Sequence, residues 1–178
     1  MNNNRTEIAP DAVEKAVSGD RKALEELLTG IQDPVFHLSL RMLGSIPDAE
    51  DATQEILLKV MTHLSSFRGE SAFTTWVFRI AVNHLKDYKK HMFANHPLSF
   101  EYYGADIDSG KEIPALSPEL DHDLLEQELK LSCTNVMLQC LDPESRCIFI
   151  LGTMFQADSR IAGDILDMTP ENYRQKLS

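Results

Sequence analysis

The sequence lacks several features that would assign it to a common class of protein. Its 178 residues contain no apolar run approaching the roughly 18 residues needed to cross a membrane. The first ten residues, MNNNRTEIAP, lack the basic and apolar regions of a secretory signal peptide. From these absences we expect a cytoplasmic protein with no membrane insertion of its own.

Motifs for catalysis and for metal or cofactor binding are also missing. The chain has no glycine-rich nucleotide loop, no Ser/His/Asp arrangement, and six His residues without a His-x-x-x-His pair. Cys133, Cys140 and Cys147 are too widely spaced for a typical zinc site. We therefore predict no enzymatic activity, no cofactor and no metal. The cysteines are expected to be buried, reduced thiols, with an unsupported redox role as the alternative.

Basic residues are scarce overall but concentrated in one place. Lys and Arg number 17 against 28 Asp and Glu, which gives a net charge of −11. Such a charge argues against a protein that coats nucleic acid, because phosphates would be repelled. Yet residues 73–90 carry four cations against one acid, whereas residues 97–130 carry nine acids against two cations. This segregation favours a carrier with one DNA-facing surface.

Residues 73–90 predict an amphipathic helix with a narrow basic stripe. At about 100° per residue, one sector of roughly 60° contains Arg79, Asn83, Lys86 and Lys90. Apolar side chains occupy most of the remaining arc. The stripe could bind phosphates, or it could be an ordinary solvated face. Trp76 could stack on a base, although packing in the core is the favoured interpretation.

Helical periodicity elsewhere predicts an all-α fold. In the N-terminal half, helices are expected over residues 11–28, with a possible break at 18–20, over 34–43 and over 48–64. Gly44 is the expected end of the second helix. The apolar stripe of the third helix includes Ala52, Ile56, Leu57, Val60, Met61 and Leu64. Residues 65–72 form a polar loop, with Gly69 as its flexible point.

The C-terminal part predicts a helix-turn-helix. Helix starts are indicated at Asp142–Pro143, at Asp158 or Ser159, and at Thr169–Pro170. The helix beginning near Asp158 uses Ile161, Ala162, Ile165 and Leu166 as its apolar side. Asp167–Met168 is the expected turn.

Two ordered runs, DAEDATQE at residues 48–55 and SSFRGESAFTTWVFRIAVNHLKDYKK at residues 65–90, resemble region two of the extracytoplasmic-function (ECF) sigma factors of bacterial RNA polymerase. The resemblance implies two small helical domains. Residues 1–92 would be the region-two bundle and residues 119–178 a region-four helix-turn-helix. Residues 93–118 would be a flexible acidic linker between them.

The resemblance also assigns a polymerase contact to the acidic helix. In the family this helix binds the beta-prime clamp helices of the polymerase core. The positions carried over are Asp48, Asp51, Gln54 and Glu55. The alternative is purely structural, because acids near a helix N-terminus favour the helix dipole.

The family's next loop and helix open the promoter and capture a flipped base of the minus-ten element. The positions carried over for this contact are Phe67, Arg68, Ser71, Trp76, Arg79, Asn83, Lys86 and Lys90. For the minus-thirty-five element, which region four reads while it contacts the beta flap, the candidates are Thr169, Glu171, Asn172, Arg174, Gln175 and Lys176.

Region four departs from the family pattern in two ways. Its turn carries Leu166–Asp167–Met168 in place of Leu-Gly-hydrophobic, which Asp tolerates because it adopts left-handed backbone better than most residues. The chain also stops at Ser178, about two to three turns into the recognition helix. Residues 142–178 are net acidic. We expect either a shortened chain or weak upstream binding.

The resemblance implies a transcription initiation factor that binds core polymerase and promoter DNA, with an anti-sigma factor as a further partner. Two alternatives stay open. A sigma-like decoy would bind an anti-sigma factor without reaching DNA, but would leave the basic stripe unexplained. A plain helix-turn-helix regulator would leave the acidic helix at residues 48–55 and the long linker unexplained.

Overall fold

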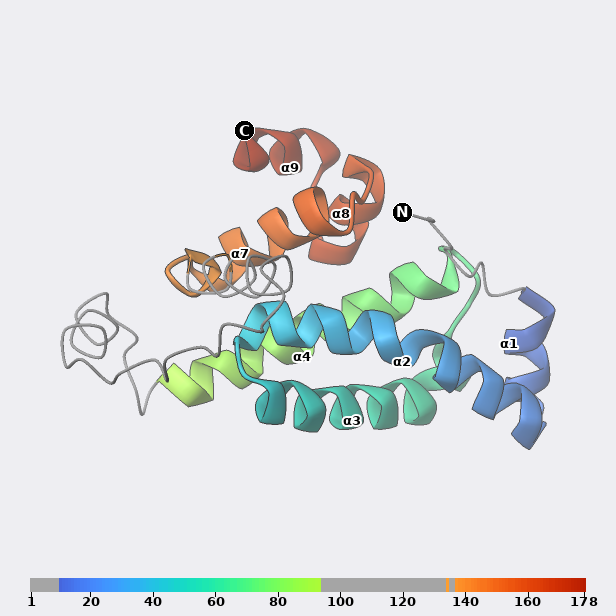
Figure 1. The fold of residues 1–178 in the computed structure, drawn as a ribbon. Coiled ribbons are helices and arrows are strands. Elements are labelled where there is room, and N and C mark those ends of the chain that lie inside the picture. The colour runs from blue at the N-terminus through green and yellow to red at the C-terminus, as the bar shows by residue number, and fades with distance from the viewer. Residues whose placement is uncertain (1–9, 94–133, 135–136) are drawn as a thin grey trace, which may run out of the picture.

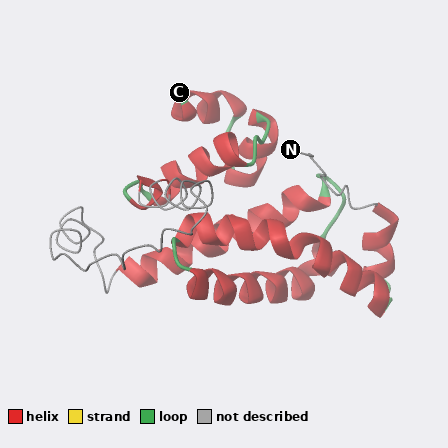
Figure 2. Cartoon of the chain, viewed as in Figure 1, coloured by secondary structure: helices red, strands yellow, loops and turns green. Residues whose placement is uncertain are grey.

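The computed structural model describes residues 10–93, 134 and 137–178, and these residues form helices and loops without a strand (Figure 2). The predicted all-α fold is confirmed. Most of the predicted linker, residues 94–118, lies outside the described residues, as does Cys133. None of the described helices is both long and apolar enough to cross a membrane.

The N-terminal helices are α1 (Pro10–Val17) and α2 (Arg21–Leu43). The predicted break is confirmed, and Asp20 caps α2 by accepting hydrogen bonds from the N–H groups of Lys22 and Ala23. The prediction of a separate helix starting at Pro34 is wrong, because α2 continues through that residue. Proline removes a helix hydrogen bond. Here the buried face of α2 continues on both sides of Pro34, so packing in the core keeps the helix continuous despite the proline.

Three long helices form the first part of the core. Gly44 ends α2 in the left-handed region at φ 74°, as predicted. The helices α3 (Ile46–His63), η1 (Leu64–Ser66) and α4 (Phe73–Phe93) follow. The fully buried side chains between α2, α3 and α4 include Val35, Leu38, Ala52, Ile56, Val60, Val77, Ala81 and Leu85. Met61 was predicted to face this core, but it is 40% exposed.

The C-terminal part consists of α7 (Pro143–Phe149), the π-helical η2 (Ile150–Met154), α8 (Ser159–Leu166) and α9 (Pro170–Leu177). The predicted caps Asp142, Asp158 and Thr169 each accept hydrogen bonds from the first backbone N–H groups of their helices. Asp167 adopts the left-handed conformation, with φ 56°, so the predicted turn is also confirmed. Ile161 was predicted to pack inward but is 38% exposed.

The two parts share one apolar core. Figure 1 shows α3 on one side of α2 and α4, and α7–α9 on the other. Buried residues of α7, η2 and α8, such as Ile148, Leu151 and Ala162, belong to the same cluster as those of α2–α4. The C-terminal helices are therefore packed against the N-terminal bundle.

A buried arginine joins these parts. Arg146 is 1% exposed, and its guanidinium donates to the main-chain oxygen of Met42 at 2.7 Å and to those of Leu138, Gln139 and Leu141. Met42 lies in the last turn of α2, where carbonyls lack helical partners and attract a cation. Burial lowers the pKa of Arg146 to about 10, so the side chain is charged at neutral pH.

The cysteines behave differently from one another. Cys147 is buried, with its sulfur 3.4 Å from that of Met42, and burial raises the pKa of its thiol to about 12. The prediction of a buried, reduced thiol is confirmed for Cys147. It is wrong for Cys140, which is exposed because it lies in the turn before α7.

Candidate functional site

An aromatic cluster closes the loop between η1 and α4. The Phe67 ring lies 5.4 Å from that of Phe73 and 5.5 Å from that of Trp76, between ring centroids. Trp76 and Phe73 are 5.7 Å apart. Trp76 is half-buried and packs against the core, which supports the favoured interpretation of this residue. The cluster fixes the loop against the start of α4.

A pocket lies beside this cluster. Its volume is about 480 Å³, and the side chains around it are Ser66, Phe67, Arg68, Glu70, Ser71, Trp76, Arg79 and Asp164. Five of the residues predicted for the minus-ten element, namely Phe67, Arg68, Ser71, Trp76 and Arg79, thus gather around one cavity. Asn83 and Lys86 lie further along α4, exposed and half-buried respectively. The side chain of Lys90 lies outside the described residues.

Asp164 comes to this pocket from α8 and was not predicted. Arg79 donates from Nε to the main-chain oxygen of Asp164 at 3.0 Å, and from Nη2 to its carboxylate. The two side chains are 42% and 44% exposed. Nothing local in the sequence indicates this contact, since the residues are 85 positions apart. The only sequence feature related to the contact of Arg79 with Asp164 is the net acidity of the C-terminal part.

The acidic residues predicted to bind polymerase lie on the outer part of α3. Asp51, Gln54 and Glu55 are exposed, while Asp48 is half-buried near the Ser45 cap. Leu58 is 57% exposed, and together with Met61 it continues the side of the helix that carries Asp51 and Gln54. Sequence reasoning missed both apolar residues as surface features. A face with acidic, amide and apolar groups can bind another protein.

A polar cluster behind this face was also missed. His84 of α4 is 8% exposed, and its Nδ1 lies 2.7 Å from Nζ of Lys59. Its Nε2 lies 3.3 Å from Oε2 of Glu55. Desolvation by burial is the main cause that lowers the pKa of His84, and the Lys59 charge lowers it further; the Glu55 and Asp87 carboxylates oppose them. His84 of α4 thus contacts Lys59 through Nδ1 and lies beside Glu55 of α3, although its buried Nε2 makes no hydrogen bond.

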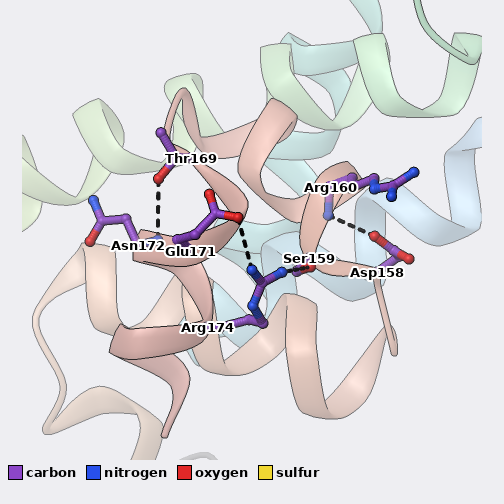
Figure 3. Close-up of polar contacts among 7 residues, drawn as sticks. All are labelled: Asp158, Ser159, Arg160, Thr169, Glu171, Asn172 and Arg174. Atoms are coloured by element: carbon purple, nitrogen blue, oxygen red, sulfur yellow. Dashed lines mark hydrogen bonds and ion pairs between the residues drawn. The ribbon is translucent and has the colours of Figure 1, made fainter.

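The residues predicted for the minus-thirty-five element are all exposed on or before α9: Thr169, Glu171, Asn172, Arg174, Gln175 and Lys176. Figure 3 shows Arg174 between Glu171 and Ser159, to which it donates at 3.0 and 2.8 Å. Lys176 pairs with Glu144 of α7. Tyr173, on the buried side of α9, anchors the helix by donating to the main-chain oxygen of Ile148 at 3.1 Å. Both cations of α9 thus already have acidic partners.

Comparison with known proteins finds a family and several relatives that match the N-terminal bundle. Residues 27–91 match the family described as Sigma-70 region 2. The ECF RNA polymerase sigma-E factors of Escherichia coli K12 and Haemophilus influenzae are each 45% identical over 76 residues, or 43% of this chain. The RNA polymerase sigma-H factor of Pseudomonas aeruginosa is 37% identical over a match of the same length. These relatives are sigma factors, which are not enzymes.

The similar sequence is a part of each relative. The match spans 39% of the Escherichia coli and Pseudomonas aeruginosa proteins and 40% of the Haemophilus influenzae protein.

A likeness in fold extends further. A chain of the structure of CnrH in complex with the cytosolic domain of CnrY matches 94% of this chain, and 88% of its own length, with a TM-score of 0.65 and 18% sequence identity. At 18% sequence identity, this similarity supports a shared fold and nothing more specific. Residues 27–91 thus match Sigma-70 region 2, and relatives that share this segment are named ECF RNA polymerase sigma-E factors.

Proposed function

We propose that this chain is a transcription initiation factor that binds the core of bacterial RNA polymerase and directs it to specific promoters. The observation that carries the proposal is the gathering of Phe67, Arg68, Ser71, Trp76 and Arg79 around one pocket within the segment that matches Sigma-70 region 2. A pocket of about 480 Å³ is large enough to admit an aromatic base.

In this proposal the pocket takes a base from the melted minus-ten element. Flipping a base costs a few kcal/mol, which contacts inside a pocket must return. Phe67 and Trp76 supply aromatic surface, while Arg68 supplies a guanidinium that can donate to base edges or phosphate. Arg79 and Lys86 continue along α4 as phosphate contacts, which would order the single strand along the helix.

The α3 helix is the proposed polymerase-binding element. Asp51, Gln54 and Glu55 offer acidic and amide groups, and the exposed Leu58 and Met61 add apolar surface beside them. Partners with a basic rim around an apolar centre fit such a face. The beta-prime clamp helices are the proposed partner, with Asp48 at the edge of the contact.

The C-terminal helices are proposed to read the minus-thirty-five element and to contact the beta flap, through the exposed polar side of α9. We keep the division into residues 1–92, 93–118 and 119–178 as part of this proposal. The acidic partners of Arg174 and Lys176 indicate that upstream contacts are weaker than those of α4.

A second candidate function is that of a regulator held by another protein, such as an anti-sigma factor. Two observations favour it: the structurally similar chain comes from a complex of CnrH with the cytosolic domain of CnrY, and both α9 cations are neutralised internally. A sequestered sigma factor and an active one are compatible states of the same chain. A plain helix-turn-helix regulator leaves the α3 face and the pocket without a role.

Binding to purified core polymerase tests the proposal. The variant Asp51→Ala/Gln54→Ala is compared with the wild type and with Gln32→Ala/Asp33→Ala, which removes the same two residue types from an exposed part of α2. We expect the α3 variant to weaken binding by about tenfold or more, and the α2 variant to bind as the wild type does. Absence of binding by the folded wild type would overturn the initiation-factor proposal and favour the sequestered regulator.

A further inference from the structure

Arg79, the central cation of the proposed nucleic-acid surface, already has an anionic ligand within the chain. The ligand is Asp164 of α8, which accepts from Arg79 through both its carboxylate and its main-chain oxygen. Asp164 also lines the same pocket as Phe67 and Trp76. Asp164, a residue of the C-terminal part, thus pairs with Arg79 and also lines the pocket.

The end of a helix suits this role. Asp164 lies in the last turn of α8, which ends at Leu166, so its main-chain oxygen is among those without a helical partner. The negative end of the helix dipole adds to the attraction for the guanidinium. A carboxylate and a carbonyl oxygen together present two acceptors to one arginine, as two oxygens of a phosphate do.

Further contacts hold α8 and its neighbours against α4. The ring of Phe155, which precedes α8, packs edge-on against Phe78 of α4, with centroids 5.2 Å apart. Phe78 is adjacent to Arg79 in the sequence. Arg146 ties the start of the same part to the end of α2 through Met42. Covering of α4 is therefore a feature of the whole packed C-terminal part, with Asp164 at its edge.

We propose that Asp164 is an internal competitor for the nucleic-acid strand: its carboxylate takes the place of a phosphate on Arg79, and a strand binds along α4 only when α8 withdraws. This inference rests on the proposed function, because it takes Arg79 to be a phosphate contact. The pair is more than two fifths exposed on each side, so the strand competes with a weak bond in water. The strand also brings several phosphates against one carboxylate.

The experiment measures binding of a short fluorescein-labelled DNA single strand to the full chain by fluorescence anisotropy at low salt. The test variant is Asp164→Asn, which keeps the shape of the side chain and removes its charge. The matched control is Asp167→Asn, three residues away, where asparagine tolerates the left-handed backbone of the original residue. A third variant, Arg79→Ala, asks whether the arginine contacts the strand.

A second readout does not involve DNA. Trp76 is the single tryptophan of the chain and lines the same pocket as Asp164. Quenching of its fluorescence by acrylamide therefore reports whether α8 covers the pocket. We expect Asp164→Asn to bind the strand about twofold to fivefold more tightly than the wild type, because the lost ion pair is exposed and therefore weak. We also expect acrylamide to quench the Trp76 fluorescence of this variant more readily. Asp167→Asn should match the wild type in quenching.

Each other result overturns the inference in a distinguishable way. Equal gains in DNA binding for Asp164→Asn and Asp167→Asn would mean that net charge alone is responsible. No gain for Asp164→Asn, with a loss for Arg79→Ala, would leave the proposed DNA contact intact but remove Asp164 as its competitor. Absence of DNA binding by every variant would remove the proposed contact at Arg79 and the competition with it. Unchanged quenching in Asp164→Asn would show that its carboxylate does not hold α8 over the pocket.

Discussion

Helices α4 and α9 differ in where the acidic partners of their cations come from. In the C-terminal part, Arg174 and Lys176 pair with Glu171 and Glu144 of the same part. In the bundle, Arg79 pairs with an acid that comes from the C-terminal part. The first kind of pair persists if the two parts separate, whereas the second is lost. Separation of the parts would therefore remove the acidic partner of Arg79 on α4 and leave the ion pairs of α9 unchanged.

The largest expected effect comes from breaking the junction between the parts. Replacing Arg146 with Met would leave the carbonyl oxygens of Met42, Leu138, Gln139 and Leu141 without this donor in a buried site. Buried groups that lose a charged partner cost several kcal/mol. We expect Arg146→Met to lower the free energy of unfolding by about 3 kcal/mol, as measured by urea denaturation.

The matched control is Arg160→Met, which removes the same charge from an exposed position of α8. Its free energy of unfolding should lie within about 0.5 kcal/mol of the wild type. A similar loss of stability in both variants would contradict the role of Arg146 as the link between α2 and α7. It would indicate instead that lost positive charge in this acidic chain accounts for the effect.

Features encoded by neighbouring residues could be predicted from the sequence, whereas contacts between distant residues could not. Helix starts at Asp142, Asp158 and Thr169 and the turn at Asp167 were predicted correctly because the chemistry of each lies within a few residues. The contact of Arg146 with Met42 spans 104 positions, and that of Arg79 with Asp164 spans 85. No local pattern encodes such pairs. The prediction of a separate helix from Pro34 failed for a related reason, because packing of the buried face of α2 keeps the helix continuous through the proline.

A smaller effect on stability is expected at His84, which is buried where α4 packs against α3. Burial lowers the pKa of His84 from its ordinary value of 6.5, and Lys59 adds to this effect, while Glu55 and Asp87 oppose it. The unfolded chain then binds the proton more readily than the folded one. The contribution of neutral His84 to stability is complete above pH 6.5 and is lost as the pH falls through the lowered pKa.

We therefore expect the free energy of unfolding to fall between neutral pH and pH about 5, by more in the wild type than in His84→Gln. Urea denaturation at a series of pH values measures this difference. The control is His37→Gln, which replaces a histidine at an exposed position of α2. Identical pH profiles for His84→Gln and the wild type would show that the junction of α3 and α4 does not depend on a neutral histidine.

The smallest expected effect sharpens the contrast between α9 and α4. Glu171 pairs with Arg174 within the same exposed turn of α9, so removing the acid should leave the arginine charge uncompensated, with its hydrogen bond to Ser159 intact and without any movement of the helices. We expect Glu171→Gln to raise the affinity for duplex DNA at low salt by about twofold, because exposed ion pairs are weak. The control is Glu26→Gln, which removes an exposed acid paired with Lys22 on α2. Acrylamide quenching of Trp76 should be unchanged in both variants, since Glu171 has no part in covering the pocket. Increased quenching in Glu171→Gln would mean that the charges of α9 help to hold the C-terminal part on the bundle, and the two kinds of ion pair would then not be independent.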